Sequence, residues 1–395
     1  EKAKKNYTND IAISYFQKAL NMMQESGFEN KELQLRGYQG LGEIYLGHGD
    51  IPKAEEAFGE ALTIATHIKL PPRQLARQYY WLAETASEHD RDDEYLQYGM
   101  MGMEILGNDN ECLEAVLMNS IVGLGSSQHG HEESEEEWKK FMRRNMAIID
   151  KIEYSRELSS PYVLISHFAL NCESPESGLE WARKLEKRAK QAGDLHGEVS
   201  ALIWIADNLR YMGDYQNSLK AHDKGLEIAE RIGSKGGISS LHFYIGEIYI
   251  FLGDLEKAEE HTRKALESSE YIGRPWAIAV NNHRLGIIAM ANHQWNEAVS
   301  CFERFADNSH ASWYPYLHLG KALLNRGDID SALHHFRNTA EKAIGDRYYV
   351  KLLYQLFLLM EEIYIKLGKP DEFKNFCNAL RQNNPKKINE KRLIQ

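Results

Sequence analysis

Cysteine is scarce in this sequence. The chain of 395 residues has four cysteines, Cys112, Cys172, Cys301 and Cys377, and no two of them form a C-x-x-C pair. Such scattered cysteines exclude the disulfide frameworks of small secreted domains. Three of the four fall in helical patterns, where cysteine packs as a small hydrophobic residue. We therefore expect a reduced, cytoplasmic protein.

Long apolar runs and an excess of basic residues are also missing. The apolar run LLYQLFLLM, residues 352–360, is far shorter than the roughly 20 residues of a membrane span. Acidic residues outnumber basic ones by 58 to 47, giving a net charge of −11, whereas a dedicated nucleic-acid surface needs surplus lysine and arginine. We interpret the one basic cluster, PKKINEKRLIQ at the C-terminus, as a solvated tail over residues 383–395. Neither a membrane nor a nucleic acid is expected as a partner.

Motifs of catalysis are absent from the chain. It contains no G-x-S-x-G and no H-E-x-x-H, and the glycines within residues 123–130 lack the spacing of a phosphate-binding loop. His129 and His131 could bind a metal with Glu132 and Glu133, but no second group of ligands accompanies them, so we interpret them as solvated loop residues. We predict no enzyme, no cofactor and no metal, while an active site assembled from distant residues stays open.

The chain does contain an internal repeat. The stretch YIGEIYIFLGDLEKAEEHTRKAL, residues 244–266, nearly repeats GLGEIYLGHGDIPKAEEAFGEAL, residues 40–62. Each copy has a hydrophobic residue followed by a small one, then a packing residue three positions on and a second, usually small, residue twelve positions on. The first small residues are Gly42, Ala83, Ser166, Ala206, Gly246, Gly286 and Gly320. The repeat therefore runs through nearly the whole chain.

The spacing of these small residues gives the number of units. Ser166, Ala206, Gly246 and Gly286 are each 40 residues apart, and Gly320 follows 34 residues later. The longer gap before Ser166 leaves room for one more unit near Gly125, and another slot lies at Glu361. At the start, residues 12–19 supply only the second helix of a unit. We predict nine complete units and one half.

Each unit has the pattern of a helical hairpin. Gly42 allows a neighbouring helix to approach, and Tyr45, three residues on along the same face, fills the space beside it. Glycine accepts the left-handed conformation that ends a helix, and aspartate caps the next one. Such Gly-Asp pairs stand at Gly49-Asp50, Gly213-Asp214, Gly253-Asp254 and Gly327-Asp328.

This order of residues resembles the tetratricopeptide repeat. The matching positions in the first full unit are Tyr38, Leu41, Gly42, Tyr45, Ala54, Phe58 and Ala61. The pitch of about 40 residues exceeds the usual 34 and resembles the long repeats of kinesin light chains, of bacterial peptide-responsive Rap-type regulators and of the sensor regions of maltose-regulator-type signalling ATPases. The resemblance implies an all-α fold, a right-handed α-solenoid of antiparallel hairpins whose first helices line a concave groove.

The repeat pattern also suggests how the chain is organised. We expect N-terminal units over residues 1–107, degenerate units over 108–194, C-terminal units over 195–382 and the basic tail over 383–395. The region 108–175 departs most from the pattern, with a Gly-rich segment and an acidic run. It is either a degenerate repeat with a longer loop or a hinge or docking loop.

The outward positions of the first helices are the expected ligand face. They are Glu43, Tyr80, Glu84, Ile203, Asp207, Arg210, Phe243, Glu247, His283, Ile287, Leu317 and Lys321. Acidic residues recur directly after the small residue, as in Glu84, Asp207 and Glu247, and they are either ligand-binding, solvated or paired with arginines of neighbouring helices. Chaperone-binding members of the family hold a C-terminal carboxylate with a Lys/Asn clamp, and its Asn position is acidic here. A basic or amphipathic peptide is therefore the expected ligand.

The predicted function is that of a non-catalytic protein-binding or peptide-binding scaffold or sensor. Because the chain begins with Glu1 and not Met, we expect it to be part of a larger, bacterial signalling, transcriptional-regulatory or defence protein. The alternative is a superhelix that senses a small molecule, as in a maltose-regulator-type signalling ATPase. The sequence predicts no oligomeric state.

Overall fold

The computed structural model describes residues 9–48, 50–88, 91–128, 132–308, 314–343 and 350–383. Within these ranges the regular structure is entirely helical. The helices are α2 (Asn9–Ser26), α3 (Lys31–His48), α4 (Ile51–His67), α5 (Pro72–Glu88), α6 (Asp92–Leu106), α7 (Leu113–Gln128), α8 (Glu132–Ile148), η1 (Ile149–Lys151), η2 (Arg156–Leu158), α9 (Ser159–Cys172), α10 (Pro175–Ala192), α11 (Leu195–Tyr211), α12 (Tyr215–Arg231), α13 (Lys235–Leu252), α14 (Leu255–Ile272), α15 (Pro275–Ala291), α16 (Trp295–Asn308), α17 (Tyr314–Arg326), α18 (Ile329–Ala343), α19 (Val350–Lys366) and α20 (Pro370–Asn383).

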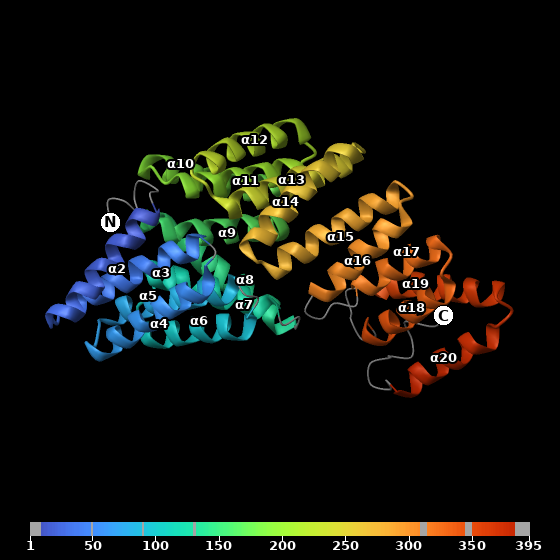
Figure 1. Cartoon of the computed structure of the whole chain (residues 1–395), viewed down its shortest axis with the longest axis horizontal. Coiled ribbons are helices and arrows are strands. Elements are labelled where there is room, and N and C mark those ends of the chain that lie inside the picture. Colours follow the sequence, from blue (N-terminus) through green and yellow to red (C-terminus); the bar gives the residue numbers. More distant parts are fainter. Residues whose placement is uncertain are drawn as a thin grey trace. The chain divides into compact units, whose positions relative to one another are not determined.

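Consecutive helices pack as hairpins, from α3 with α4 to α19 with α20, and α2 precedes the first of them (Figure 1). Among the described residues this makes nine hairpins and one single helix. The predicted all-α solenoid of nine units and a half is therefore confirmed. None of the described helices is long and apolar enough to cross a membrane.

The Gly-Asp turns separate the two helices of a hairpin. Gly253 has a φ of 77°, a left-handed conformation that suits glycine, and the Asp254 Oδ1 accepts a hydrogen bond from the backbone N–H of Lys257 at 3.2 Å. Asp50 occupies the N-cap position of α4, as predicted, but without such a bond. Its side chain pairs with Lys53 at 2.6 Å instead. Gly49 lies outside the described residues.

Three of the small residues of the repeat, all glycines, lie against an aromatic residue of the second helix of the same hairpin. A Cβ atom added to Gly42 would lie 2.5 Å from the ring of Phe58. Equivalent distances are 2.6 Å between Gly286 and Phe302 and 2.5 Å between Gly320 and Phe336. Glycine is therefore needed at these three crossings, because any side chain would displace an aromatic ring.

The first helices of successive hairpins also contact one another. α5 packs against α7, α7 against α9, α9 against α11 and α11 against α13, in addition to their own second helices. Contacts on two sides bury much of each first helix, and in α7 every residue from 115 to 123 is buried. Few side chains of a first helix can therefore reach solvent, which limits the residues available to a ligand.

The chain divides into two compact units, Glu1–Arg274 and Pro275–Gln395. The second unit has a core that includes Phe302, Leu317 and Phe336. The repeat boundaries that we expect after residues 107 and 194 both fall inside the first unit, and they stay predictions. Most of the basic tail, from residue 384 onward, lies outside the described residues.

The irregular middle of the chain contains a segment without α-helix at residues 149–158. Arg188 of α10 donates hydrogen bonds to the backbone carbonyls of Ile149, at 3.1 Å, and of Ile152. The hydroxyl of Tyr154 donates to Asp194 at 2.8 Å. These bonds fasten the segment to α10 and to the N-cap residue of α11. The Gly-rich segment covers residues 123–131: residues 123–128 form the end of α7, and residues 129–131 lie outside the described residues.

Candidate functional site

The acidic residues that follow the small packing residue lie on first helices of the first unit. Ala83 and Ala206 are fully buried in their hairpins. One residue further around the helix, Glu84 is half-buried on α5 and Asp207 is buried on α11. Glu247 occupies the same position on α13 and is half-buried. We call Glu84, Asp207 and Glu247 the acidic positions.

One acidic position belongs to an ion-pair cluster on α5. Arg274, the last residue of the first unit, donates from Nε and Nη2 to the two carboxylate oxygens of Glu88, although 186 residues separate them in sequence. Glu84 lies one turn before Glu88 on the same helix face. The pKa of Glu84 is raised to about 7, chiefly by burial and also by the charge of Glu88, while Arg274 opposes the rise. Two carboxylates therefore share one arginine.

A second cluster joins α11 to α13. Arg210 Nη2 lies 2.6 Å from Asp207 Oδ1 on the same helix, and Arg210 Nη1 lies 3.9 Å from Glu247 Oε1 on the next first helix. Burial raises the pKa of Asp207 above its usual range, against the effect of Arg210, and Glu247 adds to the rise. Here too, two carboxylates share one arginine. One alternative predicted from the sequence is that the acidic positions pair with arginines, and Asp207 and Glu247 do pair with Arg210.

Exposed aromatic and aliphatic side chains adjoin the second cluster. The Arg210 guanidinium lies 4.3 Å from the ring centroid of Tyr211 and 5.8 Å from that of Phe251. The ring of Phe251 stacks on that of Tyr215, with centroids 6.4 Å apart and planes 16° apart. With their chain neighbours these residues form what we call the aromatic patch: Tyr211, Met212, Tyr215, Phe251 and Leu252.

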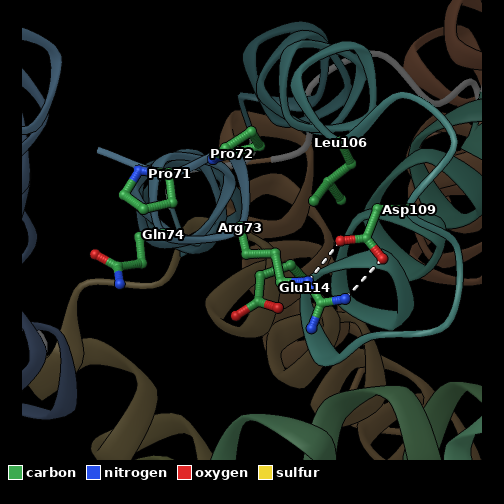
Figure 2. Close-up of a pocket in the computed structure, with 7 residues that line it drawn as sticks. All are labelled: Pro71, Pro72, Arg73, Gln74, Leu106, Asp109 and Glu114. Carbon is green, nitrogen blue, oxygen red and sulfur yellow. Dashed lines mark hydrogen bonds and ion pairs between the residues drawn. The ribbon is translucent and has the colours of Figure 1, made fainter. Parts of the chain in front are cut away.

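A hollow of the first unit lies at the start of α5. A shallow pocket of about 560 Å³ is lined by Pro71, Pro72, Arg73, Gln74, Leu106, Asp109 and Glu114. Figure 2 shows Arg73 turned toward Asp109, which it meets through two hydrogen bonds of 2.5 Å and 2.8 Å. This charge pair leaves neither group free to recognise a small ligand by charge.

A family model of the tetratricopeptide repeat matches residues 8–67 and 198–270. The chain contains tetratricopeptide repeats. Comparison with curated protein sequences gives no significant match.

Solved structures with the same architecture match this tetratricopeptide-repeat chain over most of its length. A Rap protein complexed with competence and sporulation factor is 15% identical, with a TM-score of 0.58 over 90% of this chain and 98% of the other. A monomeric mutant of IFIT1 with Gppp-AAAA is 14% identical, with a TM-score of 0.55 over 96% and 88%. The apo form of RapI is 14% identical, with a TM-score of 0.51 over 91% and 99%. At these identities the likeness concerns the fold alone.

Four of the residues expected on the ligand face are buried in this tetratricopeptide-repeat protein. Tyr80, Ile203, Asp207 and Leu317 are 5%, 8%, 5% and 2% exposed. Ile203 packs in a core cluster with Leu202 and Leu241, and Leu317 lies in the core of the second unit. The expectation that their side chains face a ligand is not met, because neighbouring helices cover both sides of a first helix.

The other expected residues keep some exposure. Glu43 and Phe243 are half-buried, and the Phe243 ring meets that of Tyr244 edge-on at 5.2 Å. In the second unit, the His283 ring lies 4.8 Å from that of His318, and burial, with a contribution from Arg284, lowers its pKa to about 4. Ile287 and Lys321 are half-buried. A role for these residues in binding stays a prediction.

No group of three or more histidine, cysteine or acidic side chains that could hold a metal occurs in the described part of this tetratricopeptide-repeat protein. His129 and His131, weighed as metal ligands in the sequence, lie outside that part. The sequence analysis missed the aromatic patch and Arg274. A signal for the patch did exist, in the repeat itself, because Tyr211 and Phe251 occupy the same repeat position.

Proposed function

We propose that this tetratricopeptide-repeat protein is a non-catalytic scaffold or sensor whose first unit binds a basic or amphipathic segment of a partner protein. The observation that carries the proposal is the composition of the two clusters on α5 and on α11 with α13. Each has two carboxylates and one arginine. When both carboxyls of a cluster are ionised, a lysine or arginine of a ligand would balance the remaining negative charge, and such a cation would favour the ionised form of Glu84, whose pKa is raised to about 7.

The structural neighbours support a binding role for the fold. The Rap protein was solved with competence and sporulation factor, and the IFIT1 mutant with Gppp-AAAA. A bacterial regulatory role for the parent protein is part of our proposal and rests on the Rap likeness. Between the two kinds of ligand, the acidic positions favour a basic peptide over an RNA, since phosphates would meet Glu84, Asp207 and Glu247.

The test compares ligands of opposite charge on one variant. Glu84→Gln, Asp207→Asn and Glu247→Gln are combined, and binding is measured by fluorescence anisotropy with a lysine-rich and arginine-rich peptide pool, a glutamate-rich pool of equal length and a capped RNA oligonucleotide. We expect the basic pool alone to bind, and its affinity to fall at least tenfold in the variant, about 1.4 kcal/mol.

A matched control separates this loss from an effect of net charge. Glu227→Gln, Glu230→Gln and Glu267→Gln remove the same charge from exposed positions on the second helices α12 and α14, and this variant should bind like the native chain. Equal losses in both variants, or preferential binding of the acidic pool or the RNA, would contradict the proposal. A thermal shift of several degrees with a sugar or nucleotide, and none with peptides, would favour the small-molecule sensor instead.

A further inference from the structure

The aromatic patch consists of large apolar side chains that the fold leaves in solvent. Tyr211, Met212, Phe251 and Leu252 are 56%, 43%, 59% and 51% exposed. They end α11 and α13, and Tyr215 begins α12, so the patch spans two successive hairpins. Single exposed apolar residues are common on protein surfaces, but a contiguous group of this size usually marks an interaction site.

The repeat itself shows that the turns do not need these residues. Tyr211 and Met212 stand five and six positions after the small residue Ala206, and Phe251 and Leu252 stand at the same positions after Gly246. In four other hairpins the same two positions are Gly47 and His48, Asn171 and Cys172, Ala291 and Asn292, and Asn325 and Arg326. Those hairpins form without an apolar pair at the turn, so folding does not account for the aromatic patch.

The composition of the patch is that of an interface centre. Aromatic residues, methionine and arginine are enriched where protein interfaces are best packed, and tyrosine and arginine are frequent among the residues that dominate affinity. Arg210 lies over two rings of the patch, held by Asp207 at 2.6 Å. The rings and the guanidinium are thus already ordered, which lowers the entropy lost on binding.

The charge around the patch selects the kind of occupant. Asp207 and Glu247 lie beside Arg210, and each turn contributes one more carboxylate, Asp214 and Asp254. The basic groups described beside them are Arg210, Lys257, which pairs with Asp254 at 3.0 Å, and Lys220, which acts on Asp214. Negative charge prevails, so phosphates are disfavoured although the rings could stack on bases. A positively charged apolar segment is favoured.

We infer that the aromatic patch is the docking surface for the apolar side chains of a partner segment in which aromatic or aliphatic residues adjoin a lysine or arginine. The apolar side chains would pack on Tyr211 and Phe251, and the cation would lie beside Glu247, because Asp207 is buried and already bound by Arg210. This inference rests on the proposed function and deepens it, because it names a second contact and the spacing of the ligand: its apolar and basic groups must be close in sequence.

The experiment uses a random peptide library displayed on phage, selected on the whole chain. We expect enrichment of peptides in which a lysine or arginine lies within about four residues of an aromatic or aliphatic residue, the reach of one helical turn. The best synthetic peptide should lose at least tenfold in affinity on Tyr211→Ser with Phe251→Ser. These side chains are exposed, so the variant should keep the native circular dichroism and melting temperature.

The control variant removes as much exposed apolar surface elsewhere. Tyr271→Ser with Leu358→Ser, at side chains 74% and 48% exposed, should leave the affinity unchanged. If the selected peptides respond to the acidic variant of the previous section but not to Tyr211→Ser with Phe251→Ser, the docking surface is wrong while the proposed function stands. If basic peptides are not enriched at all, both fail.

Other occupants of the patch give different results. A dimer in sedimentation velocity that Phe251→Ser converts to a monomer would mean that a second copy of the chain covers the patch. Binding of a single-stranded RNA that Tyr211→Ser with Phe251→Ser abolishes would mean base stacking. Either result would overturn the inference.

Discussion

Glu84 is a carboxyl group whose pKa the fold raises to near pH 7. Its pKa is raised from 4.5 to about 7, first by burial and then by Glu88. A carboxyl whose pKa is higher in the folded than in the unfolded state stabilises the fold fully below the unfolded pKa, and this contribution is lost as the pH rises through the folded pKa. The stability of the first unit should therefore decline between about pH 4.5 and pH 7 through this group.

Glu84→Gln should remove this part of the pH dependence. At pH 8 the variant is expected to be more stable than the native chain by up to about 3 kcal/mol, the limit set by the size of the shift, and by less where solvent reaches the group. At pH 4.5 the two should be equal. Urea unfolding followed by circular dichroism at both pH values measures the difference, with Glu227→Gln as the exposed control. A Gln variant that is less stable at pH 8 would contradict the assignment.

Gly42 tests the close approach inside a hairpin. In Gly42→Ala the new methyl group would lie 2.5 Å from the ring of Phe58, so the ring must move, and we expect a loss of about 1–3 kcal/mol. Gly59→Ala in the same hairpin is the matched control. No atom lies within 4 Å of its added Cβ, so alanine should be neutral or gain up to about 1 kcal/mol in helix propensity. A similar melting temperature for both variants would mean that the crossing tolerates a side chain.

At the scale of the helix, the N-cap after a Gly-Asp pair differs from one hairpin to another, although the sequence is the same at these two positions. Asp254 accepts a bond from the N–H of Lys257, whereas Asp50 makes no capping bond. Asp254→Ala should therefore cost about 1 kcal/mol. Asp50→Ala should cost less than about 0.5 kcal/mol, because it removes only an exposed pair with Lys53. Urea midpoints of the two variants measure this, and equal costs would show that Asp50 caps its helix in solution.

The helices and their pairing could be predicted because their signals are local. The small residue, the aromatic residue sixteen positions later and the Gly-Asp turn all lie within one hairpin, as in Gly42 and Phe58. Exposure could not be predicted in the same way. Tyr80, Ile203 and Leu317 occupy outward positions of an isolated hairpin, but each is covered by residues that lie beyond that hairpin in the stack. Counting positions along one helix does not reveal that cover.

The partner of Glu88 shows the same limit over a longer range. Arg274 lies 186 residues away in sequence, and nothing in the repeat pattern marks it. By contrast, the pairing of Asp207 with Arg210 could have been found, because residues three apart on a helix are neighbours. The acidic positions and Arg210 were thus recognisable from the sequence, whereas Arg274 was not.

For the first unit as a whole, the contact between Arg274 and Glu88 departs from the behaviour of a simple repeat array. In such an array each hairpin touches only its neighbours, so a substitution is felt locally. Here Arg274, two residues beyond the end of α14, binds Glu88, the last residue of α5, so the contact joins two hairpins that are not neighbours along the chain. Removing the contact between Arg274 and Glu88 should therefore destabilise both the end of α5 and the end of α14.

Arg274→Gln should therefore raise hydrogen exchange in α5 as well as at the end of α14. The pair is partly exposed, so the effect should be modest, and it should be mimicked by raising salt from 0.05 to 1 M, which shortens the screening length to about 3 Å. Arg263→Gln is the control, since Arg263 pairs with Glu259 within α14 at 2.7 Å. Its effect should stay within that helix. If exchange in α5 is unchanged in Arg274→Gln, the unit behaves as a nearest-neighbour array, and the contact contributes nothing to holding α5.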